Sequence, residues 1–146
     1  MKKITAIIIG VLFVWFTLDI TGFVVGNFTL VVSAFKDEPI DILWWAIFLV
    51  GFILFIFKDK IGKYFMLVFL AIWGLFIQAP IYFGSKEQIA GYNNFFSNER
   101  THRLIPASNS FVIKDTYHIF LDLFILISLG CVIIFTIQGF KNRRAK

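Results

Sequence analysis

Four long apolar stretches, separated by short polar segments, limit the folds open to this chain. They cover residues 4–26, 41–57, 61–83 and 116–140. A helix needs roughly 20 apolar residues to cross a hydrocarbon core about 30 Å thick, and the second stretch is at the short limit. Backbone polar groups inside lipid must pair within their own segment, so each stretch is predicted to be a helix.

The composition agrees with this interpretation. Hydrophobic residues make up 59% and charged residues 16% of the 146 residues, whereas soluble domains contain about 25% charged residues. This length suits one domain, residues 1–146. We therefore predict an all-α, polytopic membrane protein: a four-transmembrane-helix bundle with a long outer loop, residues 84–115, between its third and fourth helices.

A cleaved signal peptide is the alternative for the first stretch. Lys2 and Lys3 precede it, and residues 32–34 resemble a cleavage site. The apolar core of a signal peptide is about 7–15 residues long, which is shorter than this stretch. The stretch also contains Asp19, so we expect it to remain as a transmembrane helix.

Basic residues predict the orientation, because they are more frequent in cytoplasmic connections. Nine of the 14 lie beside helix ends that share one side: Lys2, Lys3, Lys58, Lys60, Lys63, Lys141, Arg143, Arg144 and Lys146. The other side holds Lys36, Lys86, Arg100, Arg103 and Lys114. We expect a cell-membrane protein with both termini in the cytoplasm. The net charge of +5 then reflects orientation and contact with anionic lipid, not nucleic-acid binding.

Motifs for cofactors are missing from the sequence. The chain has one cysteine, Cys131, and two histidines, which leaves no grouped ligands of the usual zinc-site kind. There is no P-loop, no glycine-rich dinucleotide turn and no serine nucleophile elbow. We expect no cofactor; the expected partners are the lipid bilayer and either a membrane or extracytoplasmic protein or further copies of this chain.

Two aspartates lie inside apolar stretches, Asp19 in the first and Asp122 in the last. At about 1.5 Å of rise per residue, each lies roughly 8 Å below the outer edge of the hydrocarbon core. Gln78 reaches about the same depth in the third stretch by the same rise. An aspartate costs about 2.5–3.5 kcal/mol at the centre of a membrane helix, so such residues are rare without a partner.

Helical spacing adds neighbours to these three residues. Residues three or four positions apart lie on one face of a helix, and three of the predicted helices each carry such a face of small or polar residues. In the first helix the face holds Asp19, Gly22 and Gly26; in the third, Ala71, Gly74, Gln78 and Tyr82; in the fourth, Asp115, His118 and Asp122. Pro80 should bend the third helix and free the carbonyl of Phe76. The second helix has no such face; it should form a lipid-facing wall, with Trp44 and Trp45 near the outer interface.

These faces predict an outward-facing polar pocket. Asp19, Gln78, His118 and Asp122 would form it, with Tyr82 at its rim. Two carboxylates in one apolar pocket raise each other's affinity for a proton. Three loop residues are available as a lid: Arg100, His102 and Arg103. Three residues on one helix face are candidate ligands of a divalent metal: Asp115, His118 and Asp122.

Structural roles remain open for the same residues. Asp115 or Thr116 can be the N-cap of the fourth helix. Asp122 can bond to His118 or Asp19 and fix helix pairing, and Gln78 can form an interhelical hydrogen bond.

Residues 28–32 are β-branched and follow Gly26-Asn27, where the first helix is expected to end. They can form a strand that pairs with residues 110–113, or the first helix can be tilted and extended.

Three functions fit this sequence, in decreasing order of preference. The first is a small membrane interaction or accessory protein, which needs no catalytic groups. The second is a proton- or cation-coupled transport component that uses Asp19 and Asp122. The third is a membrane enzyme with a metal or acid–base site on its outer face.

Overall fold

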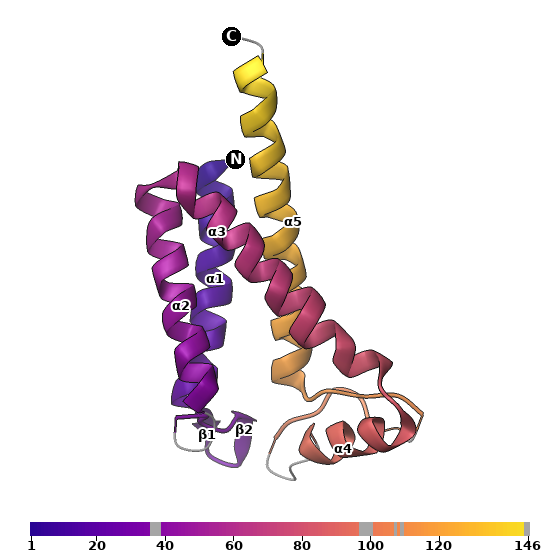
Figure 1. Ribbon diagram of the computed structural model, residues 1–146. Helices are drawn as coiled ribbons and strands as arrows, with labels where there is room; N and C mark the ends of the chain where they lie inside the picture. Colours follow the sequence, from indigo (N-terminus) through magenta and orange to yellow (C-terminus); the bar gives the residue numbers. More distant parts are fainter. Residues whose placement is uncertain (36–38, 97–100, 107, 109, 145–146) are drawn as a thin grey trace.

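The computed structural model describes residues 1–35, 39–96, 101–106, 108 and 110–144 (Figure 1). The chain is mostly helical, and four of its helical segments are long and apolar enough to cross a membrane: residues 2–21, 39–57, 59–83 and 116–140. These agree with the four predicted stretches to within a few residues, except at the end of the first. Hydrophobic length is a local property, which is why the sequence predicts it well.

Helix α1 (Lys2–Thr21) ends five residues earlier than predicted. Gly22 stops it with a φ of 75°, a conformation that L side chains rarely adopt. The chain then returns to the helix end, where Ala34 N–H donates to Asp19 O at 2.8 Å and Ser33 Oγ donates to Ile20 O at 2.6 Å. These bonds satisfy carbonyls that a helix end leaves free.

The strand expected after α1 is present, but its partner differs from the prediction. Strand β1 (Phe23–Val25) pairs antiparallel with strand β2 (Phe28–Val31) across a two-residue turn at Gly26-Asn27. Gly26 has a φ of 58°, as the first position of such a tight turn favours. The predicted pairing of residues 28–32 with 110–113 is therefore wrong. A local hairpin closes a shorter loop and costs less chain entropy.

The third long apolar segment, residues 59–83, changes helix type along its length. Helix α3 (Asp59–Ala71) leads into a π-helical turn, η1 (Ile72–Gln78), and a 3-10 turn, η2 (Ala79–Phe83). Pro80 lacks an N–H and crowds the carbonyl four residues back, so the irregularity falls where the sequence predicts it. The wider π turn brings Gly74 against α5, where an added Cβ would lie 3.1 Å from Ile125 Cγ2.

The predicted loop 84–115 contains a helix that we did not expect, α4 (Lys86–Phe96). It begins with a capping box: Ser85 N–H donates to Gln88 Oε1 at 2.8 Å, and Gln88 N–H donates to Ser85 Oγ at 3.4 Å. The pattern Ser85-x-x-Gln88 was therefore a sequence signal for this helix. Helix α5 (Thr116–Arg144) begins at the predicted residue and runs four residues further than predicted.

The four long apolar helices pack in a closed order, in which α1 contacts α2 and α5, and α3 contacts the same two helices. Both termini lie at one end of the molecule, the termini end, and the hairpin and α4 lie at the other, the hairpin end (Figure 1). Helix α2 (Pro39–Phe57) is more than a lipid-facing wall, because its buried face contributes Phe48 and Phe55 to the core. Trp45 also turns inward and donates from Nε1 to Thr17 Oγ1 at 2.9 Å.

Candidate functional site

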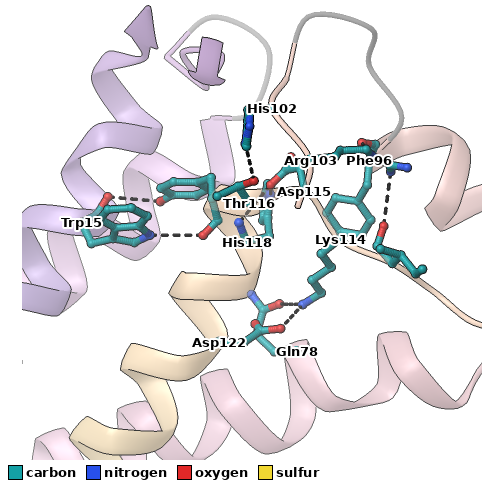
Figure 2. A network of polar contacts seen from close by, with 12 residues as sticks. Trp15, Gln78, Phe96, His102, Arg103, Lys114, Asp115, Thr116, His118 and Asp122 are labelled. Carbon is teal, nitrogen blue, oxygen red and sulfur yellow. Dashed lines mark hydrogen bonds and ion pairs between the residues drawn. The ribbon is translucent and has the colours of Figure 1, made fainter. Parts of the chain in front are cut away.

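A buried lysine is the centre of the polar site. The side chain of Lys114 has no exposed surface, and its Nζ lies 2.8 Å from Asp122 Oδ2 and 2.7 Å from Gln78 Oε1 (Figure 2). Tyr82 Oη donates to the same Asp122 Oδ2 at 2.5 Å. We call these four residues the Lys114 cluster. It joins α5, the irregular end of the third apolar segment (η1 and η2), and the connection that precedes α5.

Aromatic rings complete the surroundings of the ammonium group. Lys114 Nζ lies 4.9 Å from the centroid of the Tyr82 ring and 5.9 Å from that of Phe96. Burial lowers the pKa of Lys114 from its ordinary value because it disfavours the charged form, and the nearby carboxylate of Asp122 acts in the opposite direction. A buried ion pair depends on further hydrogen bonds to its members. Gln78 Oε1 accepts one from Lys114, and Tyr82 donates one to Asp122 Oδ2.

The connection that carries Lys114 is held by α4. Asn93 accepts from Ile113 N–H at 2.8 Å and donates to Phe111 O at 3.0 Å. Arg103, predicted as a lid residue, donates instead to Phe96 O at 3.0 Å and Ile113 O at 3.2 Å. Its guanidinium therefore fixes the backbone beside Lys114 and takes no part in the Lys114 cluster.

His102 joins the same connection to the hairpin. Its N–H donates to Thr29 O at 2.8 Å, and its O accepts from Thr116 N–H at 3.0 Å. The ring Nδ1 lies 2.8 Å from Thr116 Oγ1, and the ring packs against Phe28 with centroids 5.2 Å apart. His102, predicted as a lid residue, therefore links the connection to the hairpin. Arg100, the third predicted lid residue, lies outside the described residues.

The N-cap predicted for the fourth helix is confirmed at Asp115. Its Oδ1 accepts from His118 N–H at 2.9 Å and lies 2.8 Å from His118 Nδ1. The carboxylate satisfies a free N–H of the first turn and holds the imidazole beside it. His118 therefore pairs with Asp115, and the alternative pairing of His118 with Asp122 is wrong.

The metal site predicted from Asp115, His118 and Asp122 is not formed. Within the described part of the chain, no group of three or more His, Cys, Asp or Glu side chains is placed to hold a metal ion. The three residues do follow one another at helical spacing, i, i+3 and i+7. However, Asp115 and His118 bind each other, while Asp122 faces a lysine.

A cavity of about 320 Å³ adjoins the Lys114 cluster. Gln78, Tyr82 and Asp122 line it together with apolar residues that include Gly74 and Ile125. Asp122 Oδ1 is buried and has no hydrogen-bond partner among the described residues. The cavity is therefore apolar for most of its wall, and one oxygen of a lining carboxylate remains without a hydrogen bond among the described residues.

The structure unites three of the five predicted pocket residues. Gln78, Tyr82 and Asp122 lie together, but neither Asp19 nor His118 lines their cavity. Asp19 is buried near the end of α1. The contact between α1 and α5 nearby is aromatic: Trp15 Nε1 donates to Tyr117 O at 3.2 Å, and the two rings stack.

Lys114 is the residue that sequence reasoning missed. It precedes Asp122 by eight residues, which would be about 12 Å along a helix axis. Because Lys114 lies before the helix begins, helical spacing assigns it no face. One sequence signal for Lys114 does exist. A carboxylate inside an apolar segment needs a positive partner. The long apolar stem of a lysine beyond the helix end can lie along apolar surface and bring its ammonium group to that carboxylate.

Comparisons with protein-family models, with curated proteins and with solved structures found no match to this chain.

Proposed function

We propose that this chain is a multi-pass membrane protein that acts as an interaction or accessory subunit, and that its hairpin end binds another protein. Four helices of suitable length support membrane insertion. Large apolar side chains are exposed along their lengths, for example Ile7 at 66% and Val14 at 64%. Soluble monomers rarely expose contiguous apolar surface of this kind.

The proposed orientation follows the basic residues. The termini end carries the start of α1, the turn between α2 and α3 and the end of α5 (Figure 1). These segments hold eight of the nine basic residues predicted for the cytoplasmic side, and Lys146 lies outside the described residues. In this proposal the hairpin end therefore faces the exterior of the cell membrane.

The observation that carries the proposal is apolar surface outside the spanning helices. Val24 and Val25 of β1 are 61% and 62% exposed, and Leu104 and Ile105 of the following connection are 56% and 51% exposed. Exposed apolar surface beyond the lipid-facing region marks an interaction site. His102 ties the connection to β2 through Thr29 and Phe28, and β2 pairs with β1. A partner would therefore meet an already ordered surface.

The Lys114 cluster supports a structural role for the polar site. Its ammonium and carboxylate neutralise each other, and Gln78 and Tyr82 add hydrogen bonds. Such a cluster fixes the connection before α5 to the bundle. An interaction protein needs this rigidity, because ordering a loop at the moment of binding lowers affinity.

Photo-crosslinking in the cells that make the protein tests this function. We expect a photoreactive residue at Val24 or Val25 to yield a discrete adduct with one protein. The matched control is Val14, equally exposed on α1, which should react with lipid only. Adducts with lipid alone at all three positions would remove the support for a protein partner.

A second candidate, proton or cation binding during transport, is favoured by one observation. Asp122 lines a cavity, and its buried Oδ1 lacks a hydrogen-bond partner among the described residues. Intramembrane carboxylates often mark ion pathways.

Flux of protons or monovalent cations into proteoliposomes tests this candidate. If it is correct, Asp122→Asn abolishes the flux, because the amide keeps the size of the side chain but cannot exchange a proton. Glu87→Gln, at an exposed residue of α4, removes a similar charge and should have no effect. Wild-type flux no greater than that of empty liposomes would refute transport.

A further inference from the structure

A groove lies along the α2–α3 pair, and none of its lining residues belongs to the Lys114 cluster. Its volume is about 660 Å³, within the range of about 300–1,000 Å³ that ligand sites occupy. Trp44 and Ile47 of α2 form one wall, and Val68 and Ile72 of the third spanning segment lie opposite. Val68 is 57% exposed and Ile72 is 41% exposed, so the groove is open along an apolar surface.

The groove has the depth of one membrane leaflet. It follows the third spanning segment from Lys60 to Ile72, twelve residues, or about 18 Å at the rise of an α-helix. Half of a hydrocarbon core about 30 Å thick is about 15 Å. A single acyl chain therefore fits its length, whereas a transmembrane helix of another protein would extend well past it.

The end of the groove at the termini end is basic. Lys60 lines it, is exposed and has no ion-pair partner within the described part of the chain. Tyr64 lies four residues further, on the same helix face, and is 40% exposed. Asp59, the acidic residue of this turn, lies 4.0 Å from Lys2 Nζ.

A second lysine adds positive charge behind Tyr64. Lys63 is only 6% exposed, and its Nζ lies 5.0 Å from the centroid of the Tyr64 ring. The rings of Phe135 and Phe140 are also close, at 6.0 and 5.7 Å. The aromatic faces stabilise this ammonium, and no carboxylate within the described residues forms an ion pair with it. Two positive charges thus lie near one end of an apolar groove.

We propose that this groove binds one acyl chain of an anionic phospholipid, whose phosphate is held by Lys60 and the hydroxyl of Tyr64. The proposal rests on the membrane insertion proposed above. A second copy of the chain is the poorer occupant, because a packed helix would cover Lys60 and remove its charge from water without a partner. The basic end favours an anionic headgroup, since each basic residue near such a surface contributes about 1 kcal/mol.

The experiment uses the full chain in phosphatidylcholine vesicles that contain a small fraction of photoreactive lipid. One sample carries phosphatidylglycerol with a diazirine on its acyl chain, and the other carries phosphatidylcholine with the same group. Peptide mapping should place the phosphatidylglycerol label on residues 61–72. This label should exceed that from phosphatidylcholine about fivefold, the factor that corresponds to one basic residue at the membrane surface.

Two variants and a control separate the headgroup contact from the groove. Lys60→Gln should reduce the label from phosphatidylglycerol to the level seen with phosphatidylcholine. Val68→Trp fills the groove and should reduce both labels. Lys3→Gln removes an exposed charge at the same end, outside the groove, and should change neither. Circular dichroism checks that each variant keeps its helices.

The proposal is overturned if the two lipids label residues 61–72 equally, or if Lys60→Gln leaves the phosphatidylglycerol label unchanged. It is also overturned if a photoreactive residue at Val68 reacts with a second copy of the chain in place of lipid. These outcomes are distinct from failure of the proposed function. Release of the wild-type chain from vesicles by alkaline carbonate would refute membrane insertion, and the crosslinks at Val24 and Val25 report separately on the hairpin end.

Discussion

Lys114→Met is expected to lower the free energy of unfolding by about 3 kcal/mol, because it leaves the carboxylate of Asp122 buried without a positive partner. Loss of one member of a buried ion pair typically costs about 3–5 kcal/mol. The lower end applies here, since the Asp122 side chain is 16% exposed and water can reach part of it. Methionine preserves most of the apolar stem, so the effect isolates the charge. Reversible unfolding in detergent, followed by helical circular dichroism, measures it.

A matched control is Lys86→Met at the start of α4, where the lysine is exposed. Surface substitutions of this kind usually change stability by no more than about 0.5 kcal/mol. The double variant Lys114→Met/Asp122→Leu should recover most of the loss, because a buried ion pair can often be replaced by apolar residues without cost. A loss below about 1 kcal/mol for Lys114→Met would mean that this ion pair does not hold the connection to the bundle.

Gly62→Ala should destabilise the α2–α3 hairpin by about 3 kcal/mol, the upper end of the usual cost of overpacking. An added Cβ at Gly62 would collide with backbone atoms of Leu54 and Phe55. Backbone cannot move aside as a flexible side chain can, so the two helices must separate. The same unfolding measurement reports the loss.

Gly130→Ala is the control for this substitution, since among the described residues no atom outside its own helix lies within 4 Å of the added Cβ. Alanine has a higher helix propensity than glycine by about 1 kcal/mol, so Gly130→Ala should be neutral or stabilising. Equal losses for the two variants would show that the effect at Gly62 comes from glycine conformation and not from the close approach of α2 and α3.

The sequence alone predicts the four long apolar helices because their signal is local. Apolar length sets the helices, and a single residue such as Pro80 places the irregular turns of the third segment. Capping signals are local as well: Asp115 caps α5 as its place before the apolar stretch predicts, and the pattern Ser85-x-x-Gln88 marks the start of α4. The early end of α1 differs, since it depends on residues 33 and 34 returning to the helix.

The candidate site also has a part that local sequence signals predict and a part that depends on tertiary contacts. Helical spacing predicts that Gln78 and Tyr82 lie on one face of their helix. Once this helix packs beside α5, that face meets Asp122. Whether Asp19 joins them depends on how α1 is rotated about its axis, which its sequence does not encode. Lys114 lies outside any helix, so its direction is set by the bonds of Asn93 and Arg103 to the connecting backbone. Local periodicity and hydrophobic length therefore determined the helices and one polar face. Contacts between residues far apart in the chain decided that Lys114 is the partner of the buried Asp122 carboxylate. Lys114 lies outside a helix, so only packing sets the direction of its side chain.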